Sequence, residues 1–194
     1  MTRTAPLDRK TNEVTITGHI DLDGAGSSDV NSGLGFLDHM LETLAKHAGF
    51  DLVLSAVGDT AVDDHHTVED CAIAVGRGIS DALGDRDGIT RFADAYVALD
   101  ESLVRSVVDL SGRPWPEIHL DFATERIGDL AAENIVHFFR TLAIEARMAL
   151  HLDLIRGDNA HHQAEAAFKA TALALRSAMR ISGSGAPSTK GSLG

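Results

Sequence analysis

The chain has 194 residues, of which 44% are hydrophobic and 24% are charged, and this is the composition of a globular protein. The formal net charge of −12 argues against a nucleic-acid or anionic-membrane partner, because such a partner needs a basic face on the protein. The single cysteine, Cys71, excludes an intramolecular disulfide bond and fits a reducing compartment. No apolar run approaches the length of about 20 residues that a membrane span needs, and the first residues lack the apolar core of a secretory signal peptide. We therefore expect a cytoplasmic protein.

The first half of the sequence predicts strands and helices in alternation. Residues 13–24 alternate apolar and polar side chains and are rich in β-branched types, which is typical of a strand. Residues 36–49 repeat apolar side chains at helical spacing and end on a glycine. A second strand is predicted over 50–59 and a second helix over 66–84, followed by a turn-rich joint at 85–90.

The same order returns in the second half. Residues 91–114 predict paired strands, 132–148 a helix, 149–157 a strand, and 161–181 a helix rich in alanine and leucine. Because each half follows the order strand, helix, strand, helix, the predicted fold class is α+β. We expect two sheets with helices packed on one face of each sheet.

The predicted boundaries follow from this order. Residues 1–84 form a first α+β repeat, whose residues 1–12 are expected to be mobile, and residues 85–181 form a second repeat. Residues 182–194 are rich in serine and glycine, which predicts a flexible tail or an active-site lid. A pseudo-twofold axis is expected to relate the two repeats.

Two short motifs support this internal duplication. HMLETLA at 39–45 shares its His, Thr, Leu and Ala with HFFRTLA at 137–143, and HHTVE at 65–69 resembles HHQAE at 161–165. The first histidines of the two motifs stand 26 residues apart in the first half and 24 residues apart in the second half. Two matches in one order at nearly one spacing indicate a duplicated unit.

The repeated HHxxE motif predicts metal ligands. On a helix, residues i and i+4 lie on the same side, so the first histidine and the glutamate of each motif can converge on one ion. The second histidine points about 100° away and therefore faces a different centre. Under pseudo-twofold symmetry the two predicted ligand sets are His65, Glu69, His137 and His162, and His161, Glu165, His39 and His66.

Each set offers three imidazoles and one carboxylate. Such a set suits a catalytic centre with open coordination positions better than a closed, cysteine-rich structural zinc site. The ligand types alone do not determine whether the metal is manganese, iron, cobalt or zinc. Four other histidines are interpreted as having no role in the site: His19, His47, His119 and His151.

Five segments resemble the imidazoleglycerol-phosphate dehydratase family: LGFLDHML, DDHHTVED, DLSGRP, GDNAHHQAEAAFKA and STKGSL. The resemblance runs from about Arg9 to Leu193. It implies a duplicated α+β fold with two Mn²⁺ ions per active site, in a large octahedral homo-oligomer built from trimers. The active sites would lie at subunit interfaces, so the ligands need not all come from one chain. The implied reaction dehydrates imidazoleglycerol phosphate to imidazole-acetol phosphate in histidine biosynthesis.

The implied chemistry needs a carboxylate to move protons. The hydrogen to be lost is not acidic until the imidazole ring has expelled the neighbouring hydroxyl, which metal coordination of a ring nitrogen favours. Glu13 is similar to a substrate-contacting position of the family and is the first candidate, while Glu69 and Glu165 are ligands that could double as bases. Asp100 and Glu101 could also serve, although a turn at a strand end is an equally good interpretation of this pair.

The resemblance also implies how the phosphate is bound. Arg91, Arg113 and Lys190 match phosphate-contacting positions of the family, and a guanidinium suits phosphate because it donates two hydrogen bonds at once. Ser188, beside Lys190 in the tail, is a further substrate-binding candidate. The tail would then act as a lid that orders over substrate, and the alternative is a floppy terminus.

Two other functions stay open on the sequence. A binuclear metallohydrolase of a phosphoester would use the same ligands with a metal-bound hydroxide, and it would release inorganic phosphate. A non-catalytic metal-binding protein would need only the histidines and the negative charge. That alternative leaves the arginines and the STKG segment without a role, and such a protein should ignore a phosphate-bearing azole.

Overall fold

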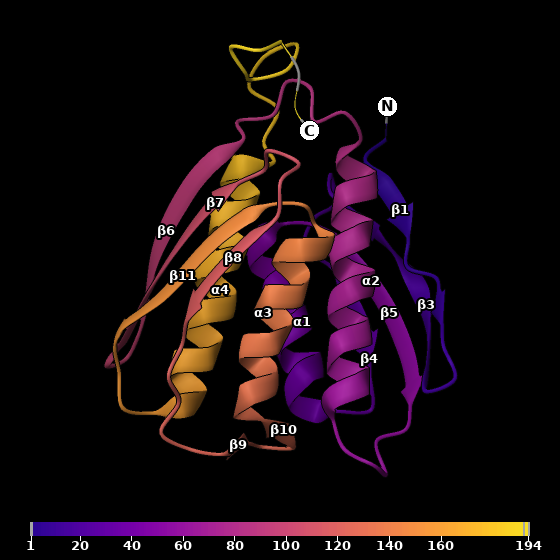
Figure 1. Cartoon of the computed structure of the whole chain (residues 1–194), viewed down its shortest axis with the longest axis vertical. Coiled ribbons are helices and arrows are strands. Elements are labelled where there is room, and N and C mark those ends of the chain that lie inside the picture. Colours follow the sequence, from indigo (N-terminus) through magenta and orange to yellow (C-terminus); the bar gives the residue numbers. More distant parts are fainter. Residues whose placement is uncertain (1, 192, 194) are drawn as a thin grey trace.

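Two β-sheets flank the helices in this computed structural model, which describes residues 2–191 and Leu193 (Figure 1). The order of the first sheet is β1-β3-β5-β4, with β2 also paired to β3. Its strands are β1 (Thr4–Pro6), β2 (Arg9–Lys10), β3 (Val14–Asp21), β4 (Ser28–Asn31) and β5 (Asp51–Gly58). In β3, buried and exposed residues alternate, so the sheet turns one apolar face toward the helices.

The second sheet repeats the connectivity of the first. Its order is β6-β7-β11-β8, and its strands are β6 (Phe92–Leu99), β7 (Ser102–Asp109), β8 (Trp115–His119) and β11 (Ala149–Arg156). β5 pairs antiparallel with β3 and parallel with β4, and β11 likewise pairs antiparallel with β7 and parallel with β8. This correspondence confirms the predicted α+β fold with two sheets.

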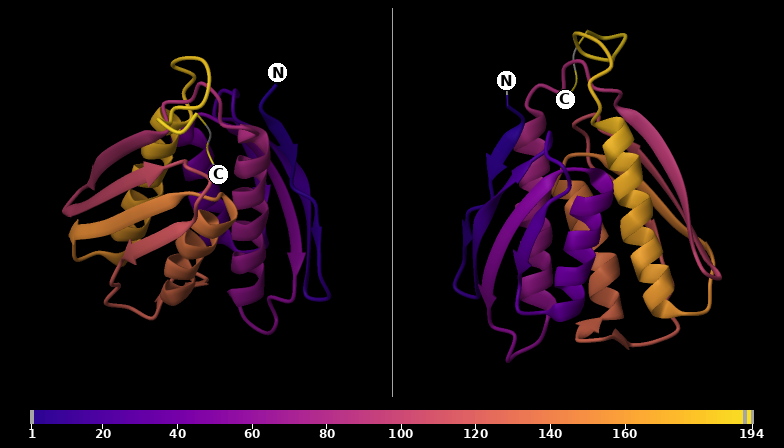
Figure 2. Two further views of the ribbon diagram at one scale, coloured as in Figure 1. Left: turned by 45° about the horizontal axis from the view of Figure 1, so that its top comes forward. Right: turned by 180° about the vertical axis from the view of Figure 1, so that it is seen from behind.

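The helices lie between the two sheets, as Figure 2 shows from two further directions. They are α1 (Gly35–Ala48), α2 (His65–Leu83), α3 (Ala132–Glu145) and α4 (Ala160–Ala178). α1 packs against α4 and α2 packs against α3, so each helix pair joins the two halves. Phe138, Phe139 and Phe168 meet in the shared core with ring centroids 4.6 to 5.6 Å apart. Because each helix pair combines one helix from each half, the HHxxE motifs at the starts of α2 and α4 lie beside a helix of the other half.

Three differences from the prediction concern short strands. β4 and β8 are edge strands that the sequence pattern does not reveal, because β4 is mostly polar and β8 contains a proline, Pro116, which is unusual in a strand. A two-stranded hairpin, β9 (Arg126–Ile127) and β10 (Leu130–Ala131), precedes α3. The predicted helices and long strands agree with the structure within a few residues at each end, apart from the paired strands of 91–114, which end at Asp109.

The prediction that residues 1–12 are mobile differs from the structure. Thr4–Pro6 and Arg9–Lys10 pair with β3, and Leu7 between them is only 1% exposed. Arg9 also forms an ion pair with Asp70 of α2, with an Nη2–Oδ1 distance of 2.7 Å. Burial of Leu7 and this ion pair give the segment a fixed place on the sheet.

The beginning of the tail is hydrogen-bonded to the loop before β6. The Ser182 N–H donates to the Gly88 carbonyl, and the Gly88 N–H donates to the Gly185 carbonyl. Arg91 Nη1 donates to the Pro187 carbonyl at 2.9 Å. Among the described residues, no helix has both the length and the apolar character needed to cross a membrane.

Candidate metal centres

The first candidate centre combines His65 and Glu69 of α2 with His137 of α3. One ligand atom from each of the three lies within 4.8 Å of the others. The His65 and His137 rings are stacked with centroids 4.9 Å apart, and His137 Nε2 lies 3.1 Å from Glu69 Oε1. Packing of α2 against α3 therefore assembles a cluster of two imidazoles and one carboxylate.

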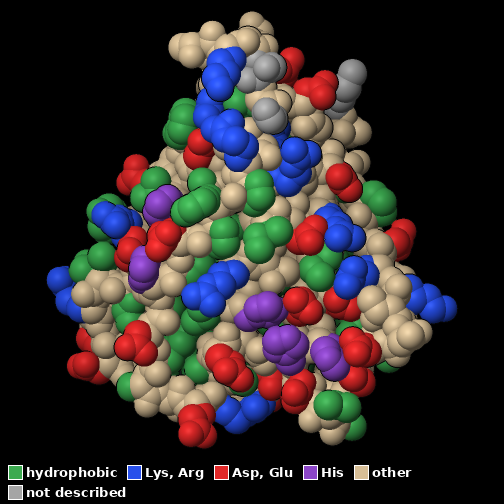
Figure 3. Space-filling model, viewed as in Figure 1, with side chains coloured by type: hydrophobic (Ala, Val, Ile, Leu, Met, Phe, Trp, Pro, Cys, Tyr) green, Lys and Arg blue, Asp and Glu red, His purple; other side chains and the backbone are tan. Residues whose placement is uncertain are grey.

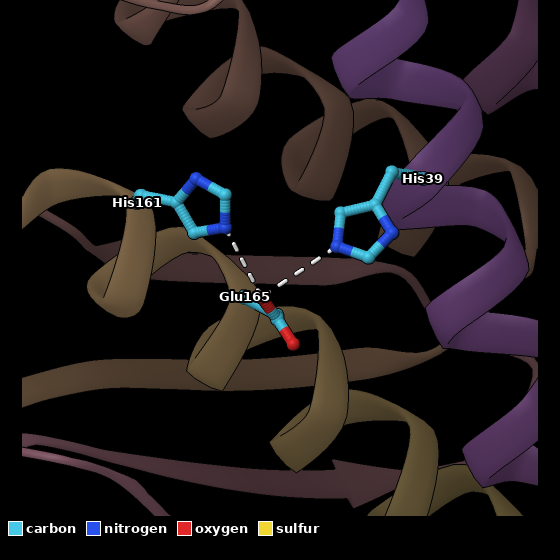
Figure 4. Close-up of side chains that lie close together, drawn as sticks. All are labelled: His39, His161 and Glu165. Atoms are coloured by element: carbon cyan, nitrogen blue, oxygen red, sulfur yellow. Dashed lines mark hydrogen bonds and ion pairs between the residues drawn. The ribbon is translucent and has the colours of Figure 1, made fainter.

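The second candidate centre combines His39 of α1 with His161 and Glu165 of α4 (Figure 4). Glu165 Oε2 lies 3.2 Å from His161 Nε2 and 3.6 Å from His39 Nε2, so both rings point at one carboxylate oxygen. The i, i+4 spacing on α4 places His161 over Glu165, and the α1–α4 contact brings in His39. The two centres are thus built in the same way from opposite helix pairs.

Lys169 makes the second centre different from the first. Its Nζ lies 2.6 Å from Glu165 Oε1, one helical turn along α4. Partial burial raises the pKa of Glu165, but the hydrogen bond and charge of Lys169, together with the imidazoles, outweigh it and hold this pKa below its usual value. Glu165 is therefore a carboxylate at neutral pH, as a metal ligand must be. In the first repeat the position that corresponds to Lys169 is Ile73.

The second histidine of each motif lies apart from both clusters in this chain. His66 Nδ1 contacts Asp59 Oδ2 at 3.0 Å, and His162 Nδ1 contacts Glu101 Oε2 at 2.8 Å. These hydrogen bonds raise the pKa of both histidines. Each predicted set of four histidine and glutamate residues is therefore present as a cluster of three within one chain, and the remaining histidine of each set contacts a carboxylate instead, Asp59 for His66 and Glu101 for His162.

Two of the proton-transfer candidates, Glu13 and Asp100, lie near His66 and His162. Glu13 is exposed, and its Oε1 is 3.7 Å from His66 Nε2. Asp100 Oδ2 is 3.7 Å from His162 Nε2. Asp100 and Glu101 do form the two-residue turn between β6 and β7, and Glu101 also accepts from the backbone N–H of Asn159. The turn interpretation therefore holds, together with a contact to His162 that the sequence did not indicate.

The phosphate candidates lie at the other end of α4. The Arg91 N–H donates to the carbonyl of Ala178, the last residue of that helix, whereas His161 is its second residue. A helix of 19 residues is about 28 Å long. The Arg91 side chain is paired with Asp109 at 2.7 Å, and Arg113 and Lys190 are exposed.

The surface reflects this separation. In the view of Figure 3, histidines gather among carboxylates on the lower part of the face, and several Lys and Arg side chains lie near the top. A cavity of about 350 Å³ opens beside the second centre, with His39, Glu165 and Lys169 in its lining. A larger cavity of about 580 Å³ lies between residues 120–126 and the start of α3 and contains none of the predicted ligands.

Some residues around the centres were not predicted from the sequence. Lys169 could have been found, because it stands four residues after Glu165 on the same helix. Asp59 and Asn134, which contact the histidines, and Asp64, which contacts Asn134, could not, because these contacts depend on how α2 meets its neighbouring segments. None of the four histidines interpreted as having no role belongs to either cluster among the described residues.

The fold and the two clusters define a class of protein. It is a duplicated α+β protein in which each HHxxE helix start faces a histidine of the partner half, and the clustered donors suit divalent metal ions. The family model of imidazoleglycerol-phosphate dehydratase matches residues 32–175.

Named relatives agree over nearly the whole chain. The chain is 49% identical to an imidazoleglycerol-phosphate dehydratase of Cereibacter sphaeroides, covering 98% of this chain and 100% of the relative. It is 50% identical to that of Methanothermobacter thermautotrophicus, covering 95% of both. A Phytophthora nicotianae relative is 52% identical, and the chain spans 42% of its length.

Solved structures give the same result. The imidazoleglycerol-phosphate dehydratase of Staphylococcus aureus superposes with a TM-score of 0.83 at 36% identity, covering 94% of this chain and 100% of that one. The Pyrococcus furiosus enzyme in complex with (S)-C348 also gives 0.83, at 31% identity, with full coverage of both chains. This chain belongs to the imidazoleglycerol-phosphate dehydratase family, whose members are hydro-lyases.

Proposed function

We propose that this protein catalyses the metal-dependent dehydration of imidazoleglycerol phosphate to imidazole-acetol phosphate in histidine biosynthesis. Membership of the family supports the reaction. The observation that supports metal dependence is the pair of matched clusters, each with two imidazoles and a carboxylate within 4.8 Å of one another.

The donor set fits the metal that the family resemblance implies. A carboxylate suits Mn²⁺, imidazoles bind first-row divalent metals in general, and three ligands per chain leave positions for a further histidine and for substrate. We propose two Mn²⁺ ions per active site, one held by His65, Glu69 and His137 and the other by His39, His161 and Glu165. His66 and His162 would complete such centres from neighbouring subunits. When bound, the metal would supply Lewis-acid polarisation and orientation of the imidazole ring.

Glu13 is the best candidate for moving the proton. Its side chain is 53% exposed, and among the described residues its one polar contact is the 3.7 Å approach to His66. Glu69 and Glu165 are already directed at imidazoles, and Glu165 is also held by Lys169. A proton carrier must reach the substrate and change its charge, and Glu13 meets both requirements with the least rearrangement.

The phosphate would be bound by Arg91, Arg113, Ser188 and Lys190. Within one chain, the Arg91 end of α4 is more than 20 Å from His161 by the rise of the helix, too far for one small substrate to span. This separation supports active sites shared between subunits. We therefore propose the large octahedral homo-oligomer, built from trimers, that the family resemblance implies.

The test is loss and recovery of activity. The protein is dialysed against a chelator, Mn²⁺ is returned, and ketone formation from imidazoleglycerol phosphate is followed together with particle size. We expect no turnover in the metal-free protein and recovery with Mn²⁺. Inorganic phosphate in place of ketone would favour the metallohydrolase, and failure to bind a phosphate-bearing azole would favour a non-catalytic metal-binding protein.

A further inference from the structure

The two candidate centres differ in what holds the imidazole that begins each HHxxE motif. His65 Nδ1 lies 3.0 Å from Asn134 Oδ1. The equivalent His161 instead meets the edge of the Phe36 ring, with centroids 5.2 Å apart and planes at 67°. Asn134 and Phe36 stand at equivalent positions of the repeat, each three residues before the cluster histidine of its own helix. At equivalent positions of the two repeats, an amide therefore contacts the imidazole of His65 and a phenyl ring contacts the imidazole of His161.

The orientation of the Asn134 amide is fixed by a buried carboxylate. Asn134 Nδ2 donates to Asp64 Oδ2 at 3.0 Å, and the two residues are 3% and 4% exposed. The same oxygen accepts from the Ala131 N–H at 2.7 Å, and Arg126 Nη1 lies 3.3 Å from Asp64 Oδ1. A reversed amide would set its oxygen against this carboxylate, and the repulsion excludes that arrangement. Asn134 Oδ1 must therefore face His65.

This arrangement determines which nitrogen of His65 is free. An amide oxygen can only accept a hydrogen bond, so His65 Nδ1 must carry the proton. In the neutral imidazole the lone pair is then on Nε2, which is the form that binds a metal. Histidine ligands usually donate their second N–H to an acceptor that fixes the ring orientation. Asn134 has the geometry of such an acceptor before any ion arrives.

We propose that Asn134, oriented by Asp64, is a positioning residue for the His65–Glu69–His137 centre and strengthens divalent-cation binding there without affecting the His39–His161–Glu165 centre. The inference rests on the two metal centres of the proposed function. It is independent of the reaction that they would support.

The test measures Mn²⁺ affinity, one centre at a time, in the full-length chelator-treated protein. Glu165→Gln weakens the second centre and leaves the first to be titrated, and Glu69→Gln does the reverse. Asn134→Leu is added to each background, because leucine has the same branched arrangement of heavy atoms as asparagine, and Phe36 shows that the equivalent position of the other repeat accepts an apolar side chain. Free Mn²⁺ is followed by electron paramagnetic resonance.

We expect Asn134→Leu to weaken Mn²⁺ binding roughly 10- to 100-fold in the Glu165→Gln background and to leave the Glu69→Gln background unchanged. The matched control is Glu133→Gln, an exposed neighbour on the same helical turn, which should change neither affinity. Asp64→Asn, which keeps Asn134 but loosens its orientation, should weaken the same centre as Asn134→Leu. It serves as the second variant if Asn134→Leu fails to fold, which thermal unfolding of the metal-free protein would reveal.

Equal Mn²⁺ affinity with and without Asn134 in the Glu165→Gln background would overturn the inference. An equal loss of Mn²⁺ affinity in both backgrounds would also overturn it, because it would signify general damage to the protein. If neither background binds Mn²⁺ while Asn134 is intact, the proposed metal centres themselves are wrong and the inference falls with them.

Discussion

The carboxylates around the candidate centres have different surroundings and therefore different capabilities. Glu165 is 16% exposed and is held by two imidazoles and Lys169, whereas Glu13 is 53% exposed and has one long contact. A residue held in this way is suited to stay charged as a ligand, and a loosely held one is suited to gain and lose a proton.

The substitution Glu13→Gln tests this division of roles. We expect turnover of imidazoleglycerol phosphate to be abolished while the Mn²⁺ content, measured by elemental analysis, stays at the wild-type value, because Glu13 belongs to neither cluster. Asp8→Asn is the matched control, as it is exposed in the same amino-terminal segment and should retain activity. Substantial residual turnover in Glu13→Gln would remove this residue from the proton-transfer role.

Asp51 gives a prediction for the pH dependence of stability. Hydrogen bonds from the backbone N–H groups of Ser27 and Ala25 hold the pKa of Asp51 below its usual value. A depressed pKa means that the ionised side chain stabilises the fold above the unfolded-state pKa, and that this stabilisation is lost as pH falls through the folded-state pKa. The difference in free energy of unfolding between wild type and Asp51→Asn should therefore shrink below about pH 4. Denaturant titrations from pH 7 to pH 3 measure it, and a constant difference would contradict the account.

At the level of elements, the long periodic segments could be predicted and the short edge strands could not. α2 and α4 are 19 residues long and amphipathic, so their own sequences specify them. β4 and β8 form strands because they pair in parallel with β5 and β11. Their conformation is therefore determined by segments elsewhere in the chain and not by their own sequences. The duplicated order of strands and helices, visible in the motifs, predicted the α+β fold with two sheets, and the structure has that fold.

The candidate centres divide in a similar way. The i, i+4 pairs His65 with Glu69 and His161 with Glu165 follow from helix geometry alone. The joining of His137 and His39 followed from the symmetry of the repeat. The Asn134 contact to His65 links residues 69 positions apart, and no local pattern encodes such a contact. Under the proposed assembly the fourth ligand of each set, His66 or His162, would come from a neighbouring subunit, and the sequence of one chain does not encode how subunits meet.

At Gly76, α2 and α3 pack so closely that there is no room for a side chain. A Cβ atom there would lie 2.7 Å from Glu145 Cβ and 3.1 Å from the Ala146 nitrogen, so Gly76→Ala should force the helices apart. We expect a loss of roughly 1–3 kcal/mol in the free energy of unfolding, as for other overpacked cores. Gly35→Ala is the control, since its nearest contact is an ordinary 3.5 Å from Asp129. Equal stability of both variants in denaturant titrations would show that the helix contact is not tight.

At the scale of the whole molecule, the candidate metal ligands His161 and Glu165 and the candidate phosphate-binding residue Arg91 lie at opposite ends of α4. A single chain would thus carry two half-sites rather than one active site. The proposed assembly of subunits would bring one end of a chain to the other end of its neighbour and so resolve the separation, and it would also give His66 and His162, which join neither cluster of their own chain, a cluster to complete.

Deletion of the carboxy-terminal tail tests the proposed binding of the substrate phosphate. Deleting residues 183–194 removes Ser188, Lys190 and the carbonyl of Pro187 that Arg91 contacts, but leaves both clusters intact. We expect the KM for imidazoleglycerol phosphate to rise steeply while the thermal unfolding temperature of the protein changes little. Unchanged steady-state kinetics would show that the tail is a terminus without a role in substrate binding.

The most direct measurement is the anomalous scattering of manganese in crystals of the Mn²⁺-loaded protein. The account predicts two peaks per chain, one against His65, Glu69 and His137 and one against His39, His161 and Glu165, with His66 or His162 of a neighbouring subunit completing each. A single peak per chain, or peaks remote from both clusters, would contradict it.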